Sequence, residues 1–400
     1  MQVLILNRFF WPDESATAML ATDLATHLVE AGHQVEVVCG RGLYTPGEQA
    51  LPSREEHRGV LVRRLGTPSA GRGSLRQRAR ALADLHLRLR LAALRLRRPD
   101  VILAMTDPPL LASAALWIRR LRGGRVVHLV ADLYPDLAEA LGTIRPRSAS
   151  ANALRWCARR WLRRCDLVVT LGERMAERLR SKGVPRIEVV PPWAPSMDVG
   201  ARDDNPVRSQ LGLGADDVLV MYAGNMGLCH PWQPVAEAIR GLASEHRLRW
   251  AFFGGGAHRL QLEAEVDRLG LHGMAFLPYQ PRERLPDLLS AADIHLVTQD
   301  RRSLGLCVPS KLAAILAVGR PTVFAGPAQA EVAQTLLDHD CGRVADEDDP
   351  GRLEEHLRDL ICDPGLRRAM GERALHAFRR EYSAEVVLPR LQEILEASAS

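Results

Sequence analysis

The stretch Val218-Leu219-Val220-Met221-Tyr222-Ala223-Gly224-Asn225-Met226-Gly227 reads as a buried strand that ends in a glycine-rich turn. Its apolar residues run on without alternation, as they do in a strand covered on both faces of a parallel sheet. Glycine in the turn lets the backbone approach a ligand closely, and backbone N–H groups near a helix start favour an anion. The stretch therefore predicts a strand of an α/β domain of the nucleotide-binding type.

The same alternation of short apolar runs and amphipathic stretches continues in both directions, which is typical of a parallel α/β sheet. In the first half the expected strands are Val3–Leu6, Val35–Cys39, Val60–Arg63, Val101–Ala104, Val126–Val130, Leu167–Leu171 and Ile187–Val190. In the second half they are Val218–Ala223, Arg249–Gly254, Met274–Leu277, Ile294–Val297, Thr322–Ala325 and Arg343–Ala345. The pattern predicts two Rossmann-like, doubly wound parallel-sheet domains.

A proline-rich segment separates these two halves, with Pro191, Pro192 and Pro195 close together and Pro206 after them. Proline continues neither a central strand nor a helix, so this segment is interpreted as a linker. We expect one domain in residues 1–195 and a second in residues 196–380. A last helix in residues 381–400 is expected to pack back toward the N-terminal domain.

Composition excludes several classes of protein. No stretch approaches the roughly 20 apolar residues of a spanning helix, and the N-terminus lacks the pattern of a signal peptide, so a cytoplasmic location is expected. The seven cysteines show no Cys-x-x-Cys spacing, which argues against a disulfide framework and a zinc site. Residues 1–195 carry 31 basic and 18 acidic residues (+13), whereas residues 196–400 carry 22 and 30 (−8). One half is therefore expected to meet an anionic surface.

Two further loops of the second half have the chemistry of an anion site. Gly254-Gly255-Gly256 follows an apolar strand and opens a helix, but it lacks the Gly-x-Gly-x-x-Gly dinucleotide fingerprint. Pro309-Ser310-Lys311 opens another helix, where Ser310 is a candidate N-cap. A cation at a helix start is unfavourable unless an anion joins it. Lys311, one of only two lysines in the chain, is therefore a candidate phosphate-binding residue.

At these residues the chain resembles the family-four glycosyltransferases, in the bacterial surface-polysaccharide branch of colanic acid and O-antigen type. The resemblance covers nearly the whole length. It rests on the order and spacing of Phe10-Trp11-Pro12, Ala31-Gly32-His33-Gln34-Val35, Asp132-Leu133-Tyr134-Pro135-Asp136, Val190-Pro191-Pro192-Trp193, Tyr222-Ala223-Gly224-Asn225, Leu289-Ser290-Ala291-Ala292-Asp293 and Val308-Pro309-Ser310-Lys311.

The resemblance implies the GT-B fold, with two domains that face each other across a cleft. It implies a nucleoside-diphosphate sugar on the C-terminal domain, an acceptor on the N-terminal domain, a retaining reaction, and no cofactor or essential metal. Lys311, backbone amides and a helix start would stabilise the leaving diphosphate instead. The donor-binding residues would be Gly224, Asn225, Gly254, Gly255, Pro309, Ser310 and Lys311, of which Lys311 would also be catalytic.

One position departs from the family pattern. The family usually carries two glutamates eight residues apart at the third loop, and the second commonly holds the donor ribose. Counted back from Gly319, these positions are Leu306 and Ala314. The ribose-binding carboxylate is therefore missing where the pattern expects it, while Lys311 is retained.

The first half supplies candidates for the acceptor site. Asp132 follows an expected strand and could orient or deprotonate an acceptor hydroxyl as a catalytic residue, or it could cap a helix in its Asp-x-x-Pro context. Glu14, Ser15 and Thr17 follow the first strand and are the other acceptor-binding candidates.

Arginine alternates with leucine and tryptophan in two expected helices of the same half. Residues 72–98 hold Arg72, Arg76, Arg78, Arg80, Arg88, Arg90, Arg95, Arg97 and Arg98, interleaved with leucines, and residues 145–164 repeat the pattern with Trp156 and Trp161. Such helices suit a lipid headgroup surface, or they are solvated faces of an arginine-rich chain. Nucleic acid is not expected, because no recognisable binding motif accompanies the charge.

The leading hypothesis is thus transfer of a hexose-type sugar to a lipid-linked or other envelope-glycan acceptor at the inner face of a membrane. A second hypothesis keeps the chemistry but uses a soluble natural product as the acceptor. A third, motivated by Leu306 and Ala314, is a non-catalytic partner protein with the same fold. A fourth is a sugar-nucleotide epimerase, which would convert the donor without an acceptor.

Overall fold

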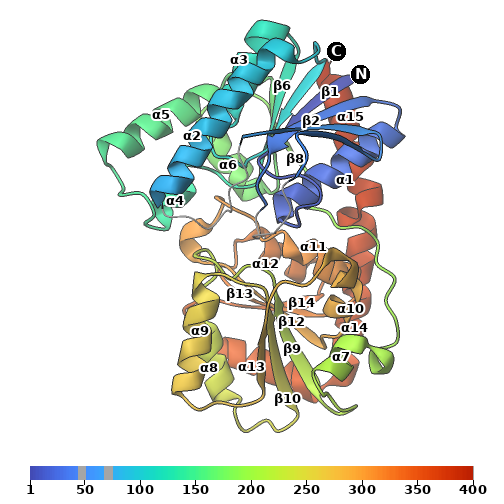
Figure 1. The fold of residues 1–400 in the computed structure, drawn as a ribbon. Coiled ribbons are helices and arrows are strands. Elements are labelled where there is room, and N and C mark those ends of the chain that lie inside the picture. The colour runs from blue at the N-terminus through green and yellow to red at the C-terminus, as the bar shows by residue number, and fades with distance from the viewer. Residues whose placement is uncertain (44–50, 67–74, 400) are drawn as a thin grey trace. The chain divides into compact units, whose positions relative to one another are not determined.

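The computed structural model describes residues 1–43, 51–66 and 75–399, although not the side chains of residues 75–79, and it divides the chain into two compact units. Unit 1 comprises Met1–Pro191 and Val387–Ser400, and unit 2 comprises Pro192–Val386. Figure 1 shows a sheet flanked by helices in each unit. The predicted class, two Rossmann-like parallel-sheet domains, is confirmed. The division falls at Pro191 and Pro192, within the proline-rich segment.

The sheet of unit 1 has the strand order β3-β4-β2-β1-β5-β6-β7-β8. The strands are β1 (Gln2–Leu6), β2 (Gln34–Gly40), β3 (Arg54–His57), β4 (Val60–Leu65), β5 (Val101–Ala104), β6 (Arg125–Val130), β7 (Leu167–Thr170) and β8 (Ile187–Val189). All neighbours pair in parallel except β3 and β4. Strand order reverses between β1 and β5, and ligands of open α/β sheets bind at the carboxyl ends of strands beside such a switch point.

Strand β3 was not among the expected strands, because Arg54-Glu55-Glu56-His57 carries no apolar signal. A strand at the edge of a sheet needs no apolar residues when both of its faces are accessible to water.

The helices of unit 1 are α1 (Ala16–Glu30), α2 (Leu75–Ala92), η1 (Ala93–Arg95), α3 (Ala112–Arg122), α4 (Asp136–Ala140), α5 (Ala149–Leu162) and α6 (Glu173–Ser181), with most of α15 (Ala384–Ala399). Gly32 and Gly183 follow the ends of α1 and α6 with φ of 85° and 77°, the left-handed conformation that favours glycine after a helix. The segment after β5 turns helical only at Ala112, because Leu110 has a left-handed φ of 67°. Helix α15 bonds to α1 and the loop after it through His27–Gln392 (3.0 Å) and His33–Glu396 (2.9 Å).

The sheet of unit 2 is parallel throughout, in the order β11-β10-β9-β12-β13-β14. Its strands are β9 (Val218–Ala223), β10 (Leu248–Phe253), β11 (Met274–Leu277), β12 (Ile294–Thr298), β13 (Thr322–Ala325) and β14 (Gly342–Ala345). The helices are α7 (Pro206–Gln210), α8 (Gln233–Gly241), α9 (Ala257–Arg268), α10 (Leu285–Ser290), α11 (Lys311–Ala317), α12 (Glu331–Asp338), α13 (Pro350–Cys362) and α14 (Pro364–Ala377). Here the strand order reverses between β9 and β12.

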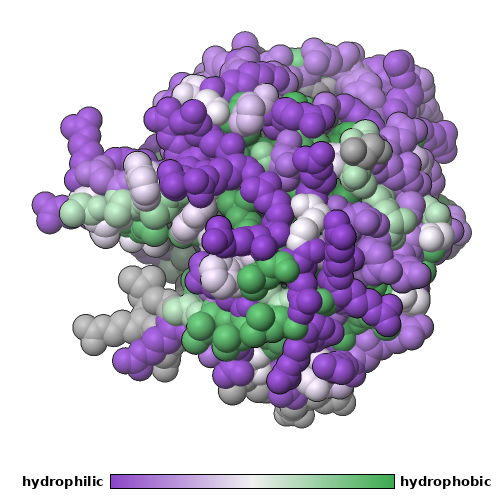
Figure 2. Space-filling model, turned by 90° about the horizontal axis from the view of Figure 1, so that it is seen from above, coloured by the Kyte–Doolittle hydropathy of each residue, from purple (hydrophilic) through white to green (hydrophobic). Residues whose placement is uncertain are grey.

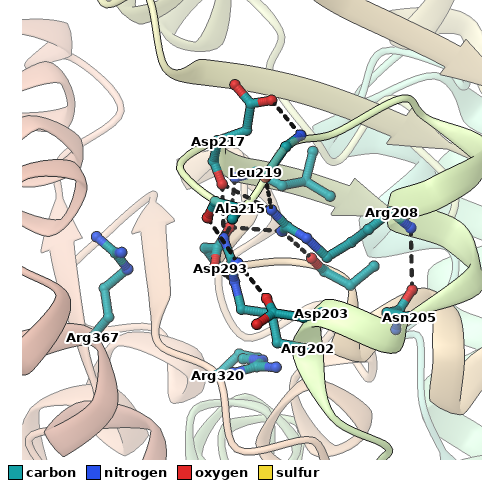
Figure 3. Close-up of polar contacts among 12 residues, drawn as sticks. Arg202, Asp203, Asn205, Arg208, Ala215, Asp217, Leu219, Asp293, Arg320 and Arg367 are labelled. Atoms are coloured by element: carbon teal, nitrogen blue, oxygen red, sulfur yellow. Dashed lines mark hydrogen bonds and ion pairs between the residues drawn. The ribbon is translucent and has the colours of Figure 1, made fainter.

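A buried ion cluster holds the amino-terminal edge of this sheet together (Figure 3). The carboxylate of Asp293, before β12, accepts hydrogen bonds from Arg202 (2.8 Å), Arg208 (2.9 Å) and the backbone N–H of Leu219 (2.8 Å). Burial by itself would raise the pKa of Asp293, but these donors and the arginine charges outweigh it and hold the pKa below its usual value. The cluster thereby ties the segment after the linker to the starts of β9 and β12.

Candidate functional site

Two glycine turns pack against each other at the carboxyl edge of the unit 2 sheet. The N–H of Gly224 donates to the carbonyl of Phe253 (2.8 Å), and the N–H of Met226 donates to that of Gly255 (2.7 Å). Gly254 and Gly256 have φ of 122° and 118°, and a Cβ on either would overlap backbone of the turn after β9. The two turns therefore form one rigid platform that only glycine permits at these positions.

Lys311 extends its ammonium group over this platform. Its Nζ is buried, lies 3.7 Å from the centroid of the Tyr222 ring, and would be 3.5 Å from a Cβ placed on Gly224. The ammonium contacts the ring face but, among the described residues, has no hydrogen-bond partner. Burial lowers the pKa of Lys311 to about 7. A buried ammonium with free donors is costly by itself, and an anion between it and the turn would remove that cost.

Two polar side chains in the segments after β9 and β12 add no negative charge to this edge of the sheet. His230, whose Nδ1 lies 2.5 Å from the carbonyl of Thr298, is neutral because burial and the Lys311 charge lower its pKa to about 3. The side-chain carbonyl of Gln299, directly after β12, is also buried and finds no partner in the described part of the chain. Neither His230 nor Gln299 was singled out from the sequence. Their only signal there is a place at or near the end of a strand.

The other predicted donor residues lie around this point. Asn225 is exposed, and its backbone carbonyl accepts the hydroxyl of Tyr222 (3.1 Å). Pro309 is buried, and Ser310 precedes α11. The expected N-cap by Ser310 is wrong, because its backbone is already helical (φ −64°, ψ −17°) and its side chain caps no N–H. An N-cap needs an extended backbone to turn its side chain toward the helix end.

Apolar packing fills the two positions where the family pattern places glutamates. Leu306 is 3% exposed, and Ala314 packs against the hydrophobic cluster around Phe324 and Ile315. These positions thus offer the site no carboxylate. Glu331 lies in the first turn of α12, after β13, at the same edge of the sheet, and was not among the candidates from the sequence.

In unit 1, Asp132 lies beside a small pocket at the carboxyl ends of β5 and β6, together with His128, Thr106 and Trp161. Burial and the negative charge of Asp107 raise the pKa of Asp132 to about 6. Burial also raises the pKa of Asp107 to about 6, although the Arg8 charge opposes it. The alternative that Asp132 caps a helix is wrong, because α4 starts at Asp136 behind Pro135. Two carboxyl groups with pKa values near neutrality suit proton transfer.

The remaining acceptor candidates surround the start of α1. Glu14 is exposed, and Ser15 is the last extended residue before the helix, with its N–H donating to Asp13 (2.8 Å). The carbonyl of Thr17 accepts a hydrogen bond from the buried Asn7 (3.2 Å). The charge of Asp13 adds to the rise in the pKa of Asp107. The loop after β1 thus belongs to the same carboxyl edge as Asp107 and Asp132.

Known families match both units. Residues 16–193 match the glycosyl transferase 4-like domain, and residues 204–377 match the glycosyl transferases group 1 domain. The chain is a family-four GT-B glycosyltransferase. The putative colanic acid biosynthesis glycosyl transferase WcaI of Escherichia coli is 28% identical to this enzyme over 84% of its chain and 85% of WcaI.

Solved structures of GT-B enzymes share the fold over 99% of the glycosyltransferase. Sucrose-phosphate synthase of Thermosynechococcus elongatus matches with a TM-score of 0.80 at 15% identity, over 98% of its own chain. Anabaena Alr3699/HepE, solved with UDP and glucose, matches with a TM-score of 0.72 at 17% identity over its whole chain. At these identities the likeness concerns the fold.

Within residues 1–43, 51–66 and 75–399, no group of three or more His, Cys, Asp or Glu side chains is arranged to hold a metal ion. In the same part of the glycosyltransferase no helix is long and apolar enough to cross a membrane.

Proposed function

We propose that this glycosyltransferase moves a hexose-type sugar from a nucleoside-diphosphate sugar to a lipid-linked or envelope-glycan acceptor, with retention of configuration and without an essential metal. The observation that carries the proposal is the buried ammonium of Lys311 above the rigid glycine platform, where no described residue bonds to it. HepE, which shares the fold, was solved with UDP and glucose, and this supports the class of donor. WcaI, a putative transferase of colanic acid biosynthesis, supports the class of acceptor.

In the donor site, the diphosphate would lie between Lys311 and the turn at Gly224. Its negative charge would raise the pKa of Lys311 from about 7 and hold the ammonium in its protonated form. As the glycosidic bond to the leaving phosphate breaks, charge grows on the phosphate oxygen, and the fixed ammonium stabilises it. Lys311 would thus supply the charge that a metal ion supplies elsewhere.

In the acceptor site, Asp132 would receive the proton of the acceptor hydroxyl. A carboxylate with a pKa of about 6 is ionised at neutral pH yet basic enough to assist that transfer. The segment that holds Glu14, Ser15 and Thr17, between β1 and the first turn of α1, would also contact the acceptor.

An exposed hydrophobic patch on unit 1 supports peripheral membrane contact. Six large apolar side chains of α2, η1, α3 and α5 are each more than 40% exposed: Leu87, Leu91, Leu94, Trp117, Leu121 and Trp156. Figure 2 shows a hydrophobic patch bordered by hydrophilic side chains on the side where α2 and α3 lie in Figure 1. Arg88, Arg95 and Arg120 belong to the same elements, and Arg72 lies outside the described residues. Leucine and tryptophan beside arginine suit an anionic headgroup surface, here the inner face of a membrane.

The test is a thermal-shift and calorimetric screen with nucleoside diphosphates and their sugars on wild type, Lys311→Ala and Lys182→Ala. Lys182 is the matched control, because it is the only other lysine and pairs with Asp136 (2.6 Å). We expect one nucleotide sugar to stabilise wild type and Lys182→Ala, and Lys311→Ala to lose this effect. Absence of nucleotide binding by folded wild type would overturn the proposal and favour the non-catalytic partner suggested by Leu306 and Ala314.

A second experiment concerns the acceptor and the membrane. Co-sedimentation with phosphatidylcholine vesicles, with and without phosphatidylglycerol, would compare wild type with Leu91→Glu/Leu94→Glu. We expect binding only to anionic vesicles, weakened by the double variant and by salt. If wild type and the double variant are equally active on soluble acceptors, and wild type binds no vesicles, a soluble natural product is favoured as the acceptor.

A further inference from the structure

A second pocket of unit 1 lies apart from Asp132, toward β2 and β4. It has a volume of about 320 Å³ and is lined by residues after β1, β2 and β4 and by one face of α2. The charged residues of this lining are Arg8, Arg41, Arg80, Asp84 and Arg88. We call it the arginine pocket.

The spacing along α2 builds one wall. Arg80, Asp84 and Arg88 recur every four residues and so lie on one face of the helix, as do Ala81 and Leu85 between them. The opposite wall comes from the loops after the strands. The charged face of α2 thus lies opposite the carboxyl ends of the strands, which is the edge where α/β domains bind ligands.

Four guanidinium groups and one carboxylate line this space. The Nε of Arg88 donates a hydrogen bond to the carboxylate of Asp84 (2.8 Å), so this carboxylate already has a partner. Arg41 donates to the neutral carbonyl of Leu51 (2.9 Å), a contact that does not compensate its charge. The carboxylate paired with Arg8, Asp107, is 3.9 Å away and has a raised pKa. The pocket therefore holds an excess of positive charge.

Glycine keeps the floor of the pocket open. Gly66 has φ of 86°, and a Cβ there would lie 3.4 Å from the carboxylate of Asp84. A Cβ on Gly40 would lie 2.9 Å from the carbonyl oxygen of Arg8. Larger residues at either position would push on the walls and narrow the space.

We propose that the arginine pocket binds a phosphate or diphosphate group of the acceptor. Guanidinium groups bind phosphate oxygens in pairs of parallel hydrogen bonds. The pocket carries an excess of about three positive charges, which a ligand with a single carboxylate would not neutralise. This inference rests on the proposed function, because it names the chemical class of the acceptor.

The position of the pocket also sets a distance. Asp132 follows β6, and β5 alone separates β6 from β1, which carries Arg8 into the pocket. Because adjacent strands lie about 4.8 Å apart, the ends of β1 and β6 lie about 10 Å apart along the sheet edge. A phosphate bound in the pocket would therefore anchor the acceptor near Asp132 without occupying the place of the reacting hydroxyl.

Calorimetry with inorganic pyrophosphate tests the pocket, with Lys311→Ala as the background so that the donor site does not contribute. In this background we expect Arg41→Gln/Arg80→Gln to weaken pyrophosphate binding by about tenfold or more, since hydrogen bonds to charged groups are lost. Asp84→Asn should tighten binding, because it removes the opposing carboxylate. Arg174→Gln/Arg186→Gln, on the surface of the same unit, is the matched control and should change nothing.

Unchanged affinity in the Arg41/Arg80 variant, with a melting temperature equal to that of its background, would overturn the inference. If that variant loses binding to phosphatidylglycerol vesicles while keeping its pyrophosphate affinity, the pocket contacts lipid headgroups, which also overturns it. Failure here is distinct from failure of the proposed function, which is read from nucleotide binding to protein that retains Lys311.

Discussion

The two edges of the unit 2 sheet treat buried charge in opposite ways. At the amino-terminal edge, Asp293 accepts hydrogen bonds from two arginines and a backbone N–H (Figure 3). At the carboxyl edge, the ammonium of Lys311 is buried over Tyr222 with no hydrogen-bond partner among the described residues. A buried charge that is fully paired holds a fold together, whereas one left unpaired is a place prepared for a ligand. The difference separates structure from function within one domain.

The largest expected effect comes from breaking the paired edge. Asp293→Ala would leave the buried Arg208 without its carboxylate and remove one partner of the partly exposed Arg202, which costs about 3–5 kcal/mol of unfolding free energy. Urea unfolding of the variant and of wild type measures this difference. The control is Asp203→Ala, whose carboxylate is 79% exposed although it also bonds Arg202 (3.2 Å), and which should behave like wild type. Equal stability of all three proteins would mean that the cluster is not structural.

A substitution of Lys311, at the unpaired edge, should change the unfolding free energy in the opposite direction and by a smaller amount. Lys311→Met removes a buried ammonium that bonds to no described residue, and it keeps a long apolar side chain, so the ligand-free protein should gain about 1–2 kcal/mol of stability. The same variant should bind no nucleotide. Urea unfolding without ligand checks the gain, and a destabilised Lys311→Met would show that the lysine supports the fold.

The pH dependence sharpens this comparison. The pKa of Lys311 is about 7 in the folded chain against an ordinary value of 10.5, so between these pH values the unfolded chain binds more protons. Stability of the ligand-free wild type should therefore rise relative to Lys311→Met as the pH increases from about 7 toward 10. Unfolding of both proteins at about pH 7 and about pH 9 measures it. A constant difference between them would contradict a lowered pKa.

The smallest effect concerns the carboxyl edge of unit 1. The negative charge of Asp107 contributes to the raised pKa of Asp132, so Asp107→Asn should shift the acid limb of the kcat/KM profile to lower pH. The shift is modest, because burial remains the main cause of the raised pKa. The direction of this shift is the test. An acid limb that stays at the same pH or moves to higher pH would mean that Asp132 does not titrate in catalysis.

Much of the fold and part of the site followed from local patterns. The strands that end at Ala223 and Ala325 were recognisable as apolar runs, and the isolated lysine at a helix start pointed to Lys311. The N-cap by Ser310 could not be judged in this way, because it depends on whether its backbone is extended or already helical. Strand β3 stayed hidden, because a polar edge strand is defined by its neighbour β4 and not by its own residues.

The α/β class, the family and the strand-end loops can be recognised in the sequence, because they depend on periodicity and on residues adjacent in the chain. Which charges are paired depends instead on how the chain folds. Asp293 meets Arg202 91 residues away, and the arginine pocket joins Arg8, Arg41 and Arg80 from separate elements. Pairing and burial set the pKa of each group, and both arise from contacts distant in the chain that no local pattern contains.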